Sequence, residues 1–341
     1  MPTRPLSLAL FGATSAVGRS VLQVLEDRDT PLASLKLLAQ DPAPGTVLEL
    51  RGEEHPVEPV KEGSFRGCEV AIFSAGSAAS REWAPRARAE GCAVVDDSSA
   101  FRKDADVPLV VAEVNPEALA GWKARGIVAN PNCATTPLLV ALKPLHAAAG
   151  VDRLVVSTYQ AVSGAGQEAV EQLEREAQAL MNGVEPDAPH AVPYRIAFNL
   201  VPQIGAFLPG GYTEEEQAIA DETRRILGDA ALRASATAVR VPVFYGHSWS
   251  VNLRTRRKLS ADEARALLRQ APGVKVVDDP QERVYPMPLL VVNDDSVLVG
   301  RVREDPSQEN GLELFVSADN LRKGSATNAV QLAELLGESY L

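Results

Sequence analysis

The chain has 341 residues, 45% of them hydrophobic, and a formal net charge of -11. That length allows two domains with large cores. The acidic residues are spread along the sequence without a basic block or a basic aromatic stripe, which argues against nucleic acid as a partner. We therefore expect an ordinary globular protein that binds small molecules, including anionic ones where arginines gather.

The N-terminal segment and the cysteines indicate the compartment. No apolar stretch near the start is long enough for a signal peptide or a membrane span, so we expect a cytoplasmic protein without a membrane partner. Cys68, Cys92 and Cys133 are too few and too scattered for a disulfide framework, and no pair has metal-ligand spacing. We predict no metal site.

The first part of the chain alternates apolar runs with helical or turn segments. Residues 6–11 predict a strand, residues 12–18 a tight turn and residues 19–26 an amphipathic helix. Strands alternating with helices favour a doubly wound parallel sheet of the Rossmann type. The further predicted strands are 35–39, 70–74, 93–96, 109–111 and 127–129, with a helix at 78–90 and a loop at 41–45.

After Cys133 the sequence becomes richer in strands, which predicts a second, α+β domain built on a mixed or antiparallel sheet. A last helix at 323–337 has an apolar face, and we expect it to pack back on the first domain. The strands predicted here are 154–160, 235–243, 248–255, 289–292, 296–303 and 312–317, with helices at 168–181 and 261–270 and a connection at 185–193.

Cys133 is the leading candidate nucleophile. It lies in Asn130-Pro131-Asn132-Cys133-Ala134-Thr135-Thr136-Pro137, where a turn passes into the apolar segment 138–148. A sulfur at a helix N-terminus meets unpaired N–H groups and the positive end of the helix dipole, both of which favour thiolate. The alternative interpretation is a small buried hydrophobic residue, as most free cysteines are.

Two glycine loops are candidates for holding a dinucleotide. The first follows the predicted strand 6–11 and ends where a helix begins, so its N–H groups would face a pyrophosphate. Its spacing is not GxGxxG, and a plain strand-to-helix turn is the alternative. The second follows the strand 70–74 and would lie beside the first. The candidate residues are Gly12, Thr14, Ser15, Ala16, Val17, Gly18, Ala75 and Gly76.

Four further residues have side chains suited to chemistry. His247 is a candidate acid or base, and Pro242 and Gly246 allow the chain to bend so that Arg240 faces the same pocket. Gln160 ends a strand before the flexible, glycine-rich loop 161–166, where its neutral amide would hold a carbonyl or carboxylate. Arg102 would bind an anion beyond another strand end. A solvated histidine and solvated arginines are the alternatives.

Taken together, these segments resemble the aspartate-β-semialdehyde dehydrogenase family along essentially the whole chain. The resemblance implies a two-domain enzyme, a homodimer, that reduces L-aspartyl-4-phosphate to the semialdehyde with NADP or NAD, releasing phosphate, in lysine, methionine and threonine biosynthesis. It implies a dinucleotide-binding domain at 1–132 plus about 322–341, and a catalytic and dimerisation domain at 133–321. The matching stretches are 12–18, 73–76, 97–102, 108–115, 130–135, 158–166, 198–205, 240–248 and 319–331.

The resemblance also implies a role for each candidate residue. Cys133 matches the acyl-thioester nucleophile, His247 its acid/base and Gln160 a group that positions the substrate. On the substrate side, Arg240 matches the clamp for the α-carboxylate, Glu215 the carboxylate near the amino group, and Arg102 and Asn132 the groups near the phosphate. Ser163, Gly164 and Asn320 match cofactor contacts, as do residues 14–17.

Three departures from the family pattern limit this transfer. Ala218 replaces a common lysine, so one of two cations at the phosphate is missing. Pro42 and Ala43 replace an Arg-Ser pair for the 2′-phosphate of NADP, while Asp41 would bond a ribose hydroxyl of NAD. Trp249 replaces an acidic residue and would place an aromatic surface beside the pocket. A paralogue with another acyl donor or aldehyde, and a catalytically silent nucleotide-binding member, are the alternative functions.

Overall fold

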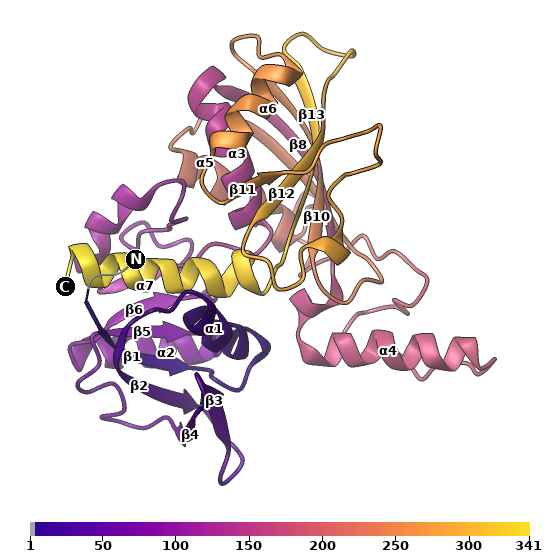
Figure 1. Ribbon diagram of the computed structural model, residues 1–341. Helices are drawn as coiled ribbons and strands as arrows, with labels where there is room; N and C mark the ends of the chain where they lie inside the picture. The colour runs from indigo at the N-terminus through magenta and orange to yellow at the C-terminus, as the bar shows by residue number, and fades with distance from the viewer. Residues whose placement is uncertain (1–3) are drawn as a thin grey trace. The chain divides into compact units, whose positions relative to one another are not determined.

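The computed structural model describes residues 4–341, and its contacts divide the chain into two units. Unit 1 runs to Asn132 and takes up Ser325–Leu341, and unit 2 is Cys133–Gly324. Each unit is built on its own sheet, with seven strands in unit 1 and six in unit 2 (Figure 1). No helix within residues 4–341 is long and apolar enough to cross a bilayer.

The sheet of unit 1 has the order β3-β4-β2-β1-β5-β6-β7, and all its pairs are parallel except β3 with β4. Because side chains alternate along a strand, β1 faces two layers. Leu8 and Leu10 pack with α1 and α7, whereas Phe11 lies edge-on to Trp83 of α2. The elements are β1 (Leu6–Phe11), α1 (Ala16–Asp27), β2 (Leu32–Ala39), β3 (Val47–Leu50), β4 (Glu53–Pro59), β5 (Val70–Phe73), α2 (Ser77–Ala89), β6 (Ala93–Asp96), a 3-10 segment (Pro116–Ala124), β7 (Ile127–Ala129) and α7 (Thr327–Ser339).

The sheet of unit 2 is mixed, in the order β11-β12-β13-β10-β8-β9. β8 pairs with β9 and β11 with β12 in parallel, and the other pairs are antiparallel. Its strands are β8 (Val151–Gln160), β9 (Arg233–Arg240), β10 (His247–Thr255), β11 (Val274–Val276), β12 (Val297–Glu304) and β13 (Gly311–Ala318). Its helices are α3 (Thr135–Ala149), α4 (Gln167–Met181), α5 (Glu214–Leu227) and α6 (Ala261–Gln270).

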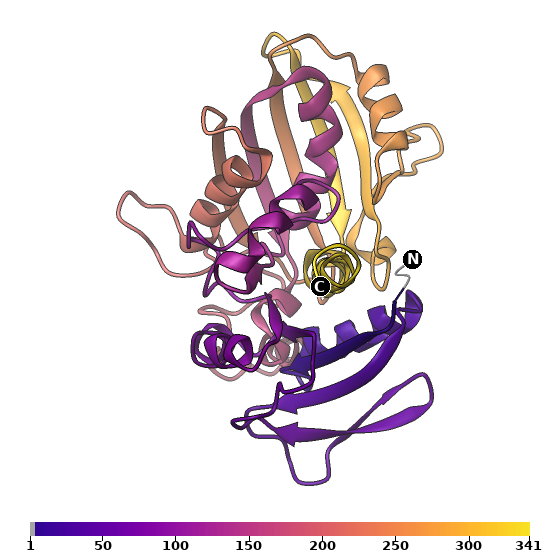
Figure 2. The ribbon, with the colours of Figure 1, turned by 90° about the vertical axis from the view of Figure 1, so that its left-hand side faces the viewer.

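Helices cover one face of this second sheet, and within residues 4–341 no helix packs across the other. Figure 2 looks onto the face covered by α3, α5 and α6. Along β8 the side chains of Leu154, Val156, Thr158 and Gln160 are buried, while those between them are partly or largely exposed. The period of two therefore directs Gln160, at the strand end, to the helix-covered face.

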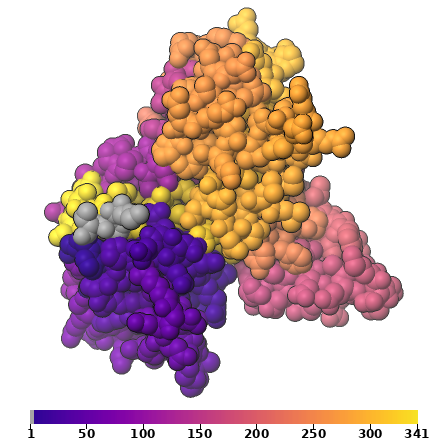
Figure 3. Space-filling view, in the orientation of Figure 1, coloured from indigo at the N-terminus to yellow at the C-terminus, as the bar shows by residue number. Residues whose placement is uncertain are grey.

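Helix α4 packs on the segment that follows it and stands out from the strands of unit 2 (Figure 3). Its buried Gln172 and Glu176 fix that segment: Gln172 Oε1 accepts from the N–H of Ala191 and Val192, and Glu176 Oε2 from that of Ile196. The connection predicted at 185–193 is therefore ordered by side chains of α4.

The predicted fold class, a doubly wound domain followed by an α+β domain with a mixed sheet, is confirmed. Some predicted elements were wrong or missed. Residues 109–111 form only a bridge from Leu109 to Ala129, and the strand predicted at 289–292 is a 3-10 turn, Pro288–Leu290. β3, β4, β11 and α5 were not predicted, and α7 is preceded by a π turn, Arg322–Ala326.

Candidate active site

Three candidate residues form a row across the end of the sheet in unit 2. Gln160 ends β8 directly opposite Arg240, the last residue of the parallel strand β9. Tyr159 is paired with Ser248 of antiparallel β10, so His247, the first residue of β10, lies beside Gln160. All three side chains are buried on the helix-covered face. The chain was predicted to bend between Arg240 and His247. In the structure this segment connects the end of β9 to the start of β10.

Cys133 lies at the start of α3, close to this row. Its Sγ is 3.7 Å from Nε2 of His247, and it is partly exposed while His247 is fully buried. The nucleophile predicted from the turn at 130–137 therefore meets the predicted acid/base. On its other side the chain returns at Gly324, where an added Cβ would come within 2.9 Å of the Cys133 carbonyl oxygen. Only glycine fits there, because the conflicting atom belongs to the backbone.

Gln160 and Arg240 are held by specific partners. Gln160 Nε2 donates to Glu215 Oε1 at 2.8 Å, and Arg240 Nη1 donates to the Ala161 carbonyl oxygen at 2.8 Å. Burial lowers the pKa of Arg240, and the nearby Cys133 and Glu215 raise it again. The structure thus places a buried guanidinium near Cys133 and Glu215, and the planar fork of an arginine suits a carboxylate.

His247 is held through its second ring nitrogen. The Ala161 backbone N–H donates to Nδ1 at 3.1 Å. Burial, and secondarily the charge of Arg240, hold the pKa of His247 well below its usual range. The imidazole is therefore neutral at neutral pH.

The glycine-rich loop after Gln160 contains a 3-10 turn, Val162–Ala165. Ser163 Oγ and the Asn320 side chain are hydrogen-bonded, and Asn320 Oδ1 also accepts from the Gly246 N–H at 3.1 Å. A Cβ on Gly164 would lie 2.9 Å from Arg240 Nη1 and 3.1 Å from His247 Nε2. The three candidate cofactor residues of unit 2 thus lie together, with Gly164 against Arg240 and His247.

The glycine loops of unit 1 form a cradle that suits a pyrophosphate. A Cβ on Gly12 would lie 2.5 Å from the Ser74 carbonyl carbon, so the two glycine loops pack against each other. A Cβ on Gly18 would lie 2.2 Å from the Gly12 carbonyl oxygen. Ser15 caps α1 by accepting from the Gly18 N–H, leaving the other first-turn N–H groups at the mouth of the loop. A twelve-residue helix starting there favours a bound anion.

Arg102 and Asn132 belong to unit 1. Arg102 follows β6, as predicted, and its guanidinium donates to the carbonyl oxygens of Asn130 and Asp97 at 2.8 Å each. Asn132 is buried. Burial raises the pKa of Asp97 to about 6, even though Asn130 and Ser325 donate to its carboxylate. Sequence reasoning missed this half-buried acid, although the adjacent acidic residues Asp96 and Asp97 at a strand end gave reason to suspect it.

The structure also shows where two of the residues lie that differ from the family pattern, Ala218 and Trp249. Ala218 lies on α5 one turn after Glu215 and so on the same helix face. Trp249, predicted to place an aromatic surface beside the pocket, is fully buried, as His247 is. Its ring lies 6.2 Å from that of His247, because both residues occupy one face of β10.

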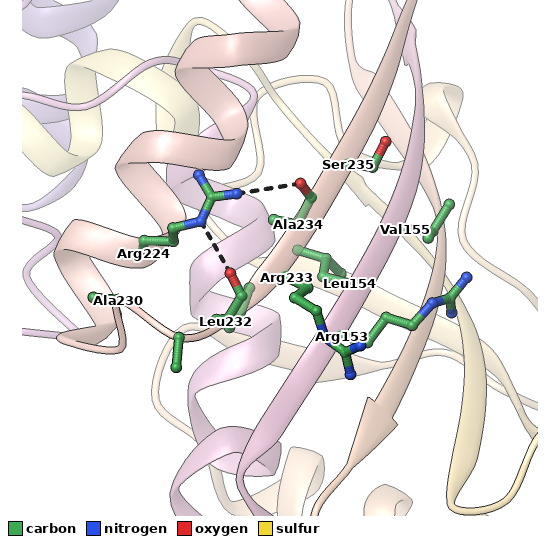
Figure 4. Close-up of a pocket in the computed structure, with 10 residues that line it drawn as sticks. Arg153, Leu154, Val155, Arg224, Ala230, Leu232, Arg233, Ala234 and Ser235 are labelled. Atoms are coloured by element: carbon green, nitrogen blue, oxygen red, sulfur yellow. Dashed lines mark hydrogen bonds between the residues drawn. The ribbon is translucent and has the colours of Figure 1, made fainter.

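A surface hollow of about 460 Å³ lies at the N-terminal ends of β8 and β9, away from Gln160 and Arg240 (Figure 4). Its arginines are engaged with the protein: Arg224 donates to the carbonyl oxygens of Leu232 and Ala234, and Arg233 to Asp152. Because Arg153 and Gln160 are seven residues apart on β8, the hollow lies about 20 Å from Gln160. Among residues 4–341, no group of three His, Cys, Asp or Glu side chains could hold a metal ion.

Comparison with known proteins adds sequence relationships to this geometry. Residues 7–122 match the model "Semialdehyde dehydrogenase, NAD binding domain", and residues 142–323 match "Semialdehyde dehydrogenase, dimerisation domain". The chain is 51% identical to aspartate-semialdehyde dehydrogenase of Aquifex aeolicus, covering 96% of this chain and 97% of that protein. It is 46% identical to the enzyme of Legionella pneumophila, covering 99% and 98%. A crystal structure of aspartate semialdehyde dehydrogenase II complexed with ASA from Vibrio cholerae has a TM-score of 0.96, 43% identity and coverage of 99% and 100%.

Proposed function

Because the chain belongs to the aspartate-semialdehyde dehydrogenase family, we propose that it reduces L-aspartyl-4-phosphate to L-aspartate 4-semialdehyde and releases phosphate. The reaction uses a nicotinamide cofactor and serves the biosynthesis of lysine, methionine and threonine. The observation that carries the proposal is the 3.7 Å approach of Cys133 Sγ to His247 Nε2 at the start of α3. The neighbouring Arg240 and Gln160 supply the groups that an amino-acid substrate requires.

The chemistry follows from these positions. The Cys133 thiolate attacks the acyl carbon, a C–S bond forms, and the C–O bond to phosphate breaks to leave a thioester. His247 serves the reacting oxygen as the acid/base group, and N–H groups at the start of α3 stabilise the tetrahedral oxyanion. The bound nicotinamide supplies the hydride that reduces the thioester to the aldehyde. Arg240 clamps the substrate α-carboxylate, Gln160 positions the substrate, and Glu215 faces the amino group.

The proposed cofactor contacts come from two groups of residues. Gly12, Thr14, Ser15, Ala16, Val17 and Gly18 hold the pyrophosphate with Ala75 and Gly76, and Ser163, Gly164 and Asn320 complete the contacts. NAD is used at least as well as NADP, because Pro42 and Ala43 supply no cation for the 2′-phosphate and Asp41 can bond a ribose hydroxyl. Steady-state kinetics with each cofactor test this, and a large preference for NADP would contradict it.

The phosphate is held by Arg102 and Asn132 with one cation fewer than is common in the family. A lysine at Ala218 would lie on the Glu215 face of α5, so Ala218→Lys should strengthen phosphate binding. One charge-assisted contact is worth roughly 1.5 to 3 kcal/mol, or at least about tenfold in the KM for phosphate. An unchanged KM would mean that another cation already fills this role.

We also infer a cytoplasmic homodimer that uses the bare face of the unit 2 sheet. Tyr159 and Phe315 stack on that face with ring centroids 6.2 Å apart, and Tyr159 is 36% exposed. Large half-exposed aromatic side chains are typical of interfaces. The three free cysteines suit a reducing compartment. Tyr159→Glu should weaken the dimer in sedimentation analysis, whereas Tyr194→Glu, outside this face, should leave it intact.

The decisive test is the oxidation of aspartate semialdehyde in the presence of phosphate. Cys133→Ala should reduce its rate by at least about 10⁴-fold, as expected for loss of a covalent nucleophile. The matched control, Cys68→Ala, removes a buried thiol of unit 1 and should retain the rate. Full activity of Cys133→Ala would exclude the thioester mechanism.

A paralogue with another acyl donor is the second candidate function, and Ala218 is the observation that favours it. A panel of related aldehydes distinguishes the two functions, because efficient turnover of aspartate semialdehyde alone excludes the paralogue. For a catalytically silent nucleotide-binding member, Cys133 would be alkylated no faster than a free thiol at neutral pH.

A further inference from the structure

Arg102, the proposed phosphate ligand of unit 1, is held by main-chain oxygens. Its Nε donates to the Asn130 carbonyl oxygen and its Nη2 to the Asp97 carbonyl oxygen, at 2.8 Å each. Both peptides are anchored in the sheet, because the Asp97 N–H donates to the Phe73 carbonyl oxygen and the Asn130 N–H to that of Asp96. The position of the guanidinium is therefore set by neutral acceptors that belong to the sheet.

The carboxylate of Asp97 lies close to this guanidinium. The carbonyl oxygen of Asp97 is 2.8 Å from Nη2. The carboxylate carbon of a residue is at most about 5 Å from its own carbonyl oxygen, so the two charged groups lie within about 8 Å of each other. Burial raises the pKa of Asp97 to about 6, and the positive charge of Arg102 opposes this rise. An anion bound by Arg102 would therefore meet a nearby group that can be charged or neutral.

The hydrogen bonds of Asp97 can serve both of these forms. The Ala112 N–H donates to Asn328 Oδ1, so the Asn328 amide nitrogen faces Asn130 Oδ1. The Asn130 amide nitrogen must then face Asp97 Oδ1, which is always an acceptor. At Oδ2 the partner is the Ser325 hydroxyl, which donates to a carboxylate and can accept from a carboxyl O–H. Protonation at Oδ2 thus reverses one hydrogen bond and breaks none.

Arg102 and Asp96 are the charged groups that act on Asp97 from the elements around it. Asp96, the last residue of β6, directs its carboxylate to the other face of the sheet, where it accepts from Ser80 of α2. The side chains that hydrogen-bond to the Asp97 carboxylate are neutral. Asp96 is thus directed at α2, whereas Asp97 also carries the carbonyl oxygen that holds Arg102.

We propose that Asp97 is an affinity-determining residue of the phosphate site: its carboxylate repels a dianion bound by Arg102, and its protonation admits one. This inference rests on the proposed function and extends it, since Arg102 is the proposed phosphate ligand. Like charges disfavour each other, and the coupling is reciprocal, so a bound dianion favours protonation of Asp97 as much as the charge of Asp97 weakens binding. Phosphate binding is accompanied by uptake of a proton from solvent, and return of that proton to solvent promotes release of the product phosphate.

The test measures equilibrium binding of sulfate to the full-length enzyme without other substrates, by isothermal titration calorimetry. Sulfate is the probe because phosphate itself titrates near neutral pH, whereas sulfate stays a dianion. In the wild type, the Kd for sulfate should rise about tenfold between about pH 5 and pH 8, as expected for one like charge at about 8 Å. Arg102→Met should weaken the binding by at least about tenfold and remove its dependence on pH.

Two variants separate the charge of Asp97 from charge elsewhere in unit 1. Asp97→Asn imitates the protonated acid, because its amide oxygen can accept from Asn130 and its amide nitrogen can donate to Ser325. At pH 8 it should bind sulfate about tenfold more tightly than the wild type, with the pH dependence lost. Glu58→Gln removes an exposed acid of β4, four strands from β6 in the same sheet, and should change neither quantity.

Proton uptake gives a second readout on the unmodified enzyme, which does not depend on the folding of a variant. Sulfate binding is measured near pH 6.5 in two buffers of different ionisation enthalpy. The wild type should take up about half a proton, as expected for a group with a pKa of about 6 and a tenfold linkage to the anion.

A sulfate Kd in the wild type that does not change with pH, an absence of proton uptake, or an unchanged pH dependence in Asp97→Asn would overturn the inference. Sulfate binding that is absent from the wild type, or that persists in Arg102→Met, would overturn it as well, because Arg102 would then not hold the anion. Each result is read without turnover and leaves the Cys133 test of the proposed function unaffected. Conversely, full activity of Cys133→Ala would refute the proposed mechanism while the linkage between sulfate and Asp97 stands.

Discussion

The two units prepare their candidate sites by different means. In unit 1 the cradle is made of backbone, and Gly12 and Gly18 are required because neighbouring backbone atoms leave no room for a Cβ. In unit 2 the site is made of buried side chains in a row across three strand ends. Substitutions in the first site should therefore change packing and the free energy of unfolding. Substitutions in the second site should change the reaction rate while the fold persists.

After loss of the Cys133 thiol, the largest effect should come from removing the imidazole of unit 2. His247→Ala loses the proposed acid/base group and should lower kcat by about 10²- to 10³-fold. His247→Gln can accept from Ala161 with its amide oxygen but cannot transfer a proton, so it should recover less than about tenfold of that loss. Steady-state kinetics and thermal unfolding together check this. A glutamine variant close to the wild-type rate would show that no transferable proton is needed at this position.

In unit 1 the corresponding test is Gly18→Ala, which should act through a steric clash. Its Cβ would fall 2.2 Å from the Gly12 carbonyl oxygen, and the backbone cannot yield without breaking the turn. We expect the free energy of unfolding to drop by about 3 kcal/mol. Gly121→Ala is the matched control, since no atom lies within 4 Å of its Cβ position. Denaturant titration of both variants measures the difference, and equal stability would remove the steric argument.

One titratable group in each unit has a shifted pKa, and the two should make stability respond to pH with opposite signs. His247 has a lowered pKa, so below pH 6.5 the unfolded chain binds its proton more tightly, and stability is lost as the pH falls, by up to about 1.4 kcal/mol per pH unit. Asp97 has a pKa raised to about 6, so its folded form prefers the proton, and its contribution falls as the pH rises from about 4 to 6.

Matched variants isolate these two contributions. Asp97→Asn should raise the free energy of unfolding at pH 8 by about 1 to 3 kcal/mol, with the gain vanishing below pH 4. His247→Gln should instead reduce the loss of stability at acid pH. Asp106→Asn, on an exposed ion pair with Arg125, is the control and should change little. If the free energy of unfolding changed with pH in the same way in all variants and in the wild type, both predicted contributions would be contradicted.

The smallest effect concerns the loop after β2. Pro42→Arg restores a cation for a 2′-phosphate and should raise the ratio of kcat/KM for NADP over NAD by about tenfold. Pro44→Arg, two residues further along the same loop, is the control for added charge alone. An equal change in both variants would indicate general attraction of the phosphate rather than a defined contact.

Elements with a clear apolar pattern were predicted correctly from the sequence, and elements marked by other features were missed. Helix α6 was predicted at its observed bounds, and short buried strands such as β1 and β6 were recognised as apolar runs between turns. Helix α5 was missed although Thr213 and Glu216 form a capping box, because its glutamates were considered only as ligands. The apolar residues at 289–292 were wrongly predicted to form a strand. Most of them are exposed, and the segment forms a turn that begins at Pro288.

The candidate site residues could be selected from the sequence largely through the family resemblance. Their arrangement could not, because it depends on strand register: Arg240 and His247 meet Gln160 only when β9 and β10 flank β8. The Ala161 peptide was unpredictable for another reason. A backbone N–H that fixes a catalytic ring leaves no trace in the side chain of its residue.

The close approach of Gly324 to Cys133 has a consequence for how the protein matures. The two residues lie at opposite ends of unit 2 in sequence, so the packing against Cys133 is completed only after all of unit 2 has been synthesised. A nascent chain therefore emerges from the ribosome with Cys133 not yet backed by Gly324, and the candidate active site of unit 2 is assembled only when the last residue of that unit is available.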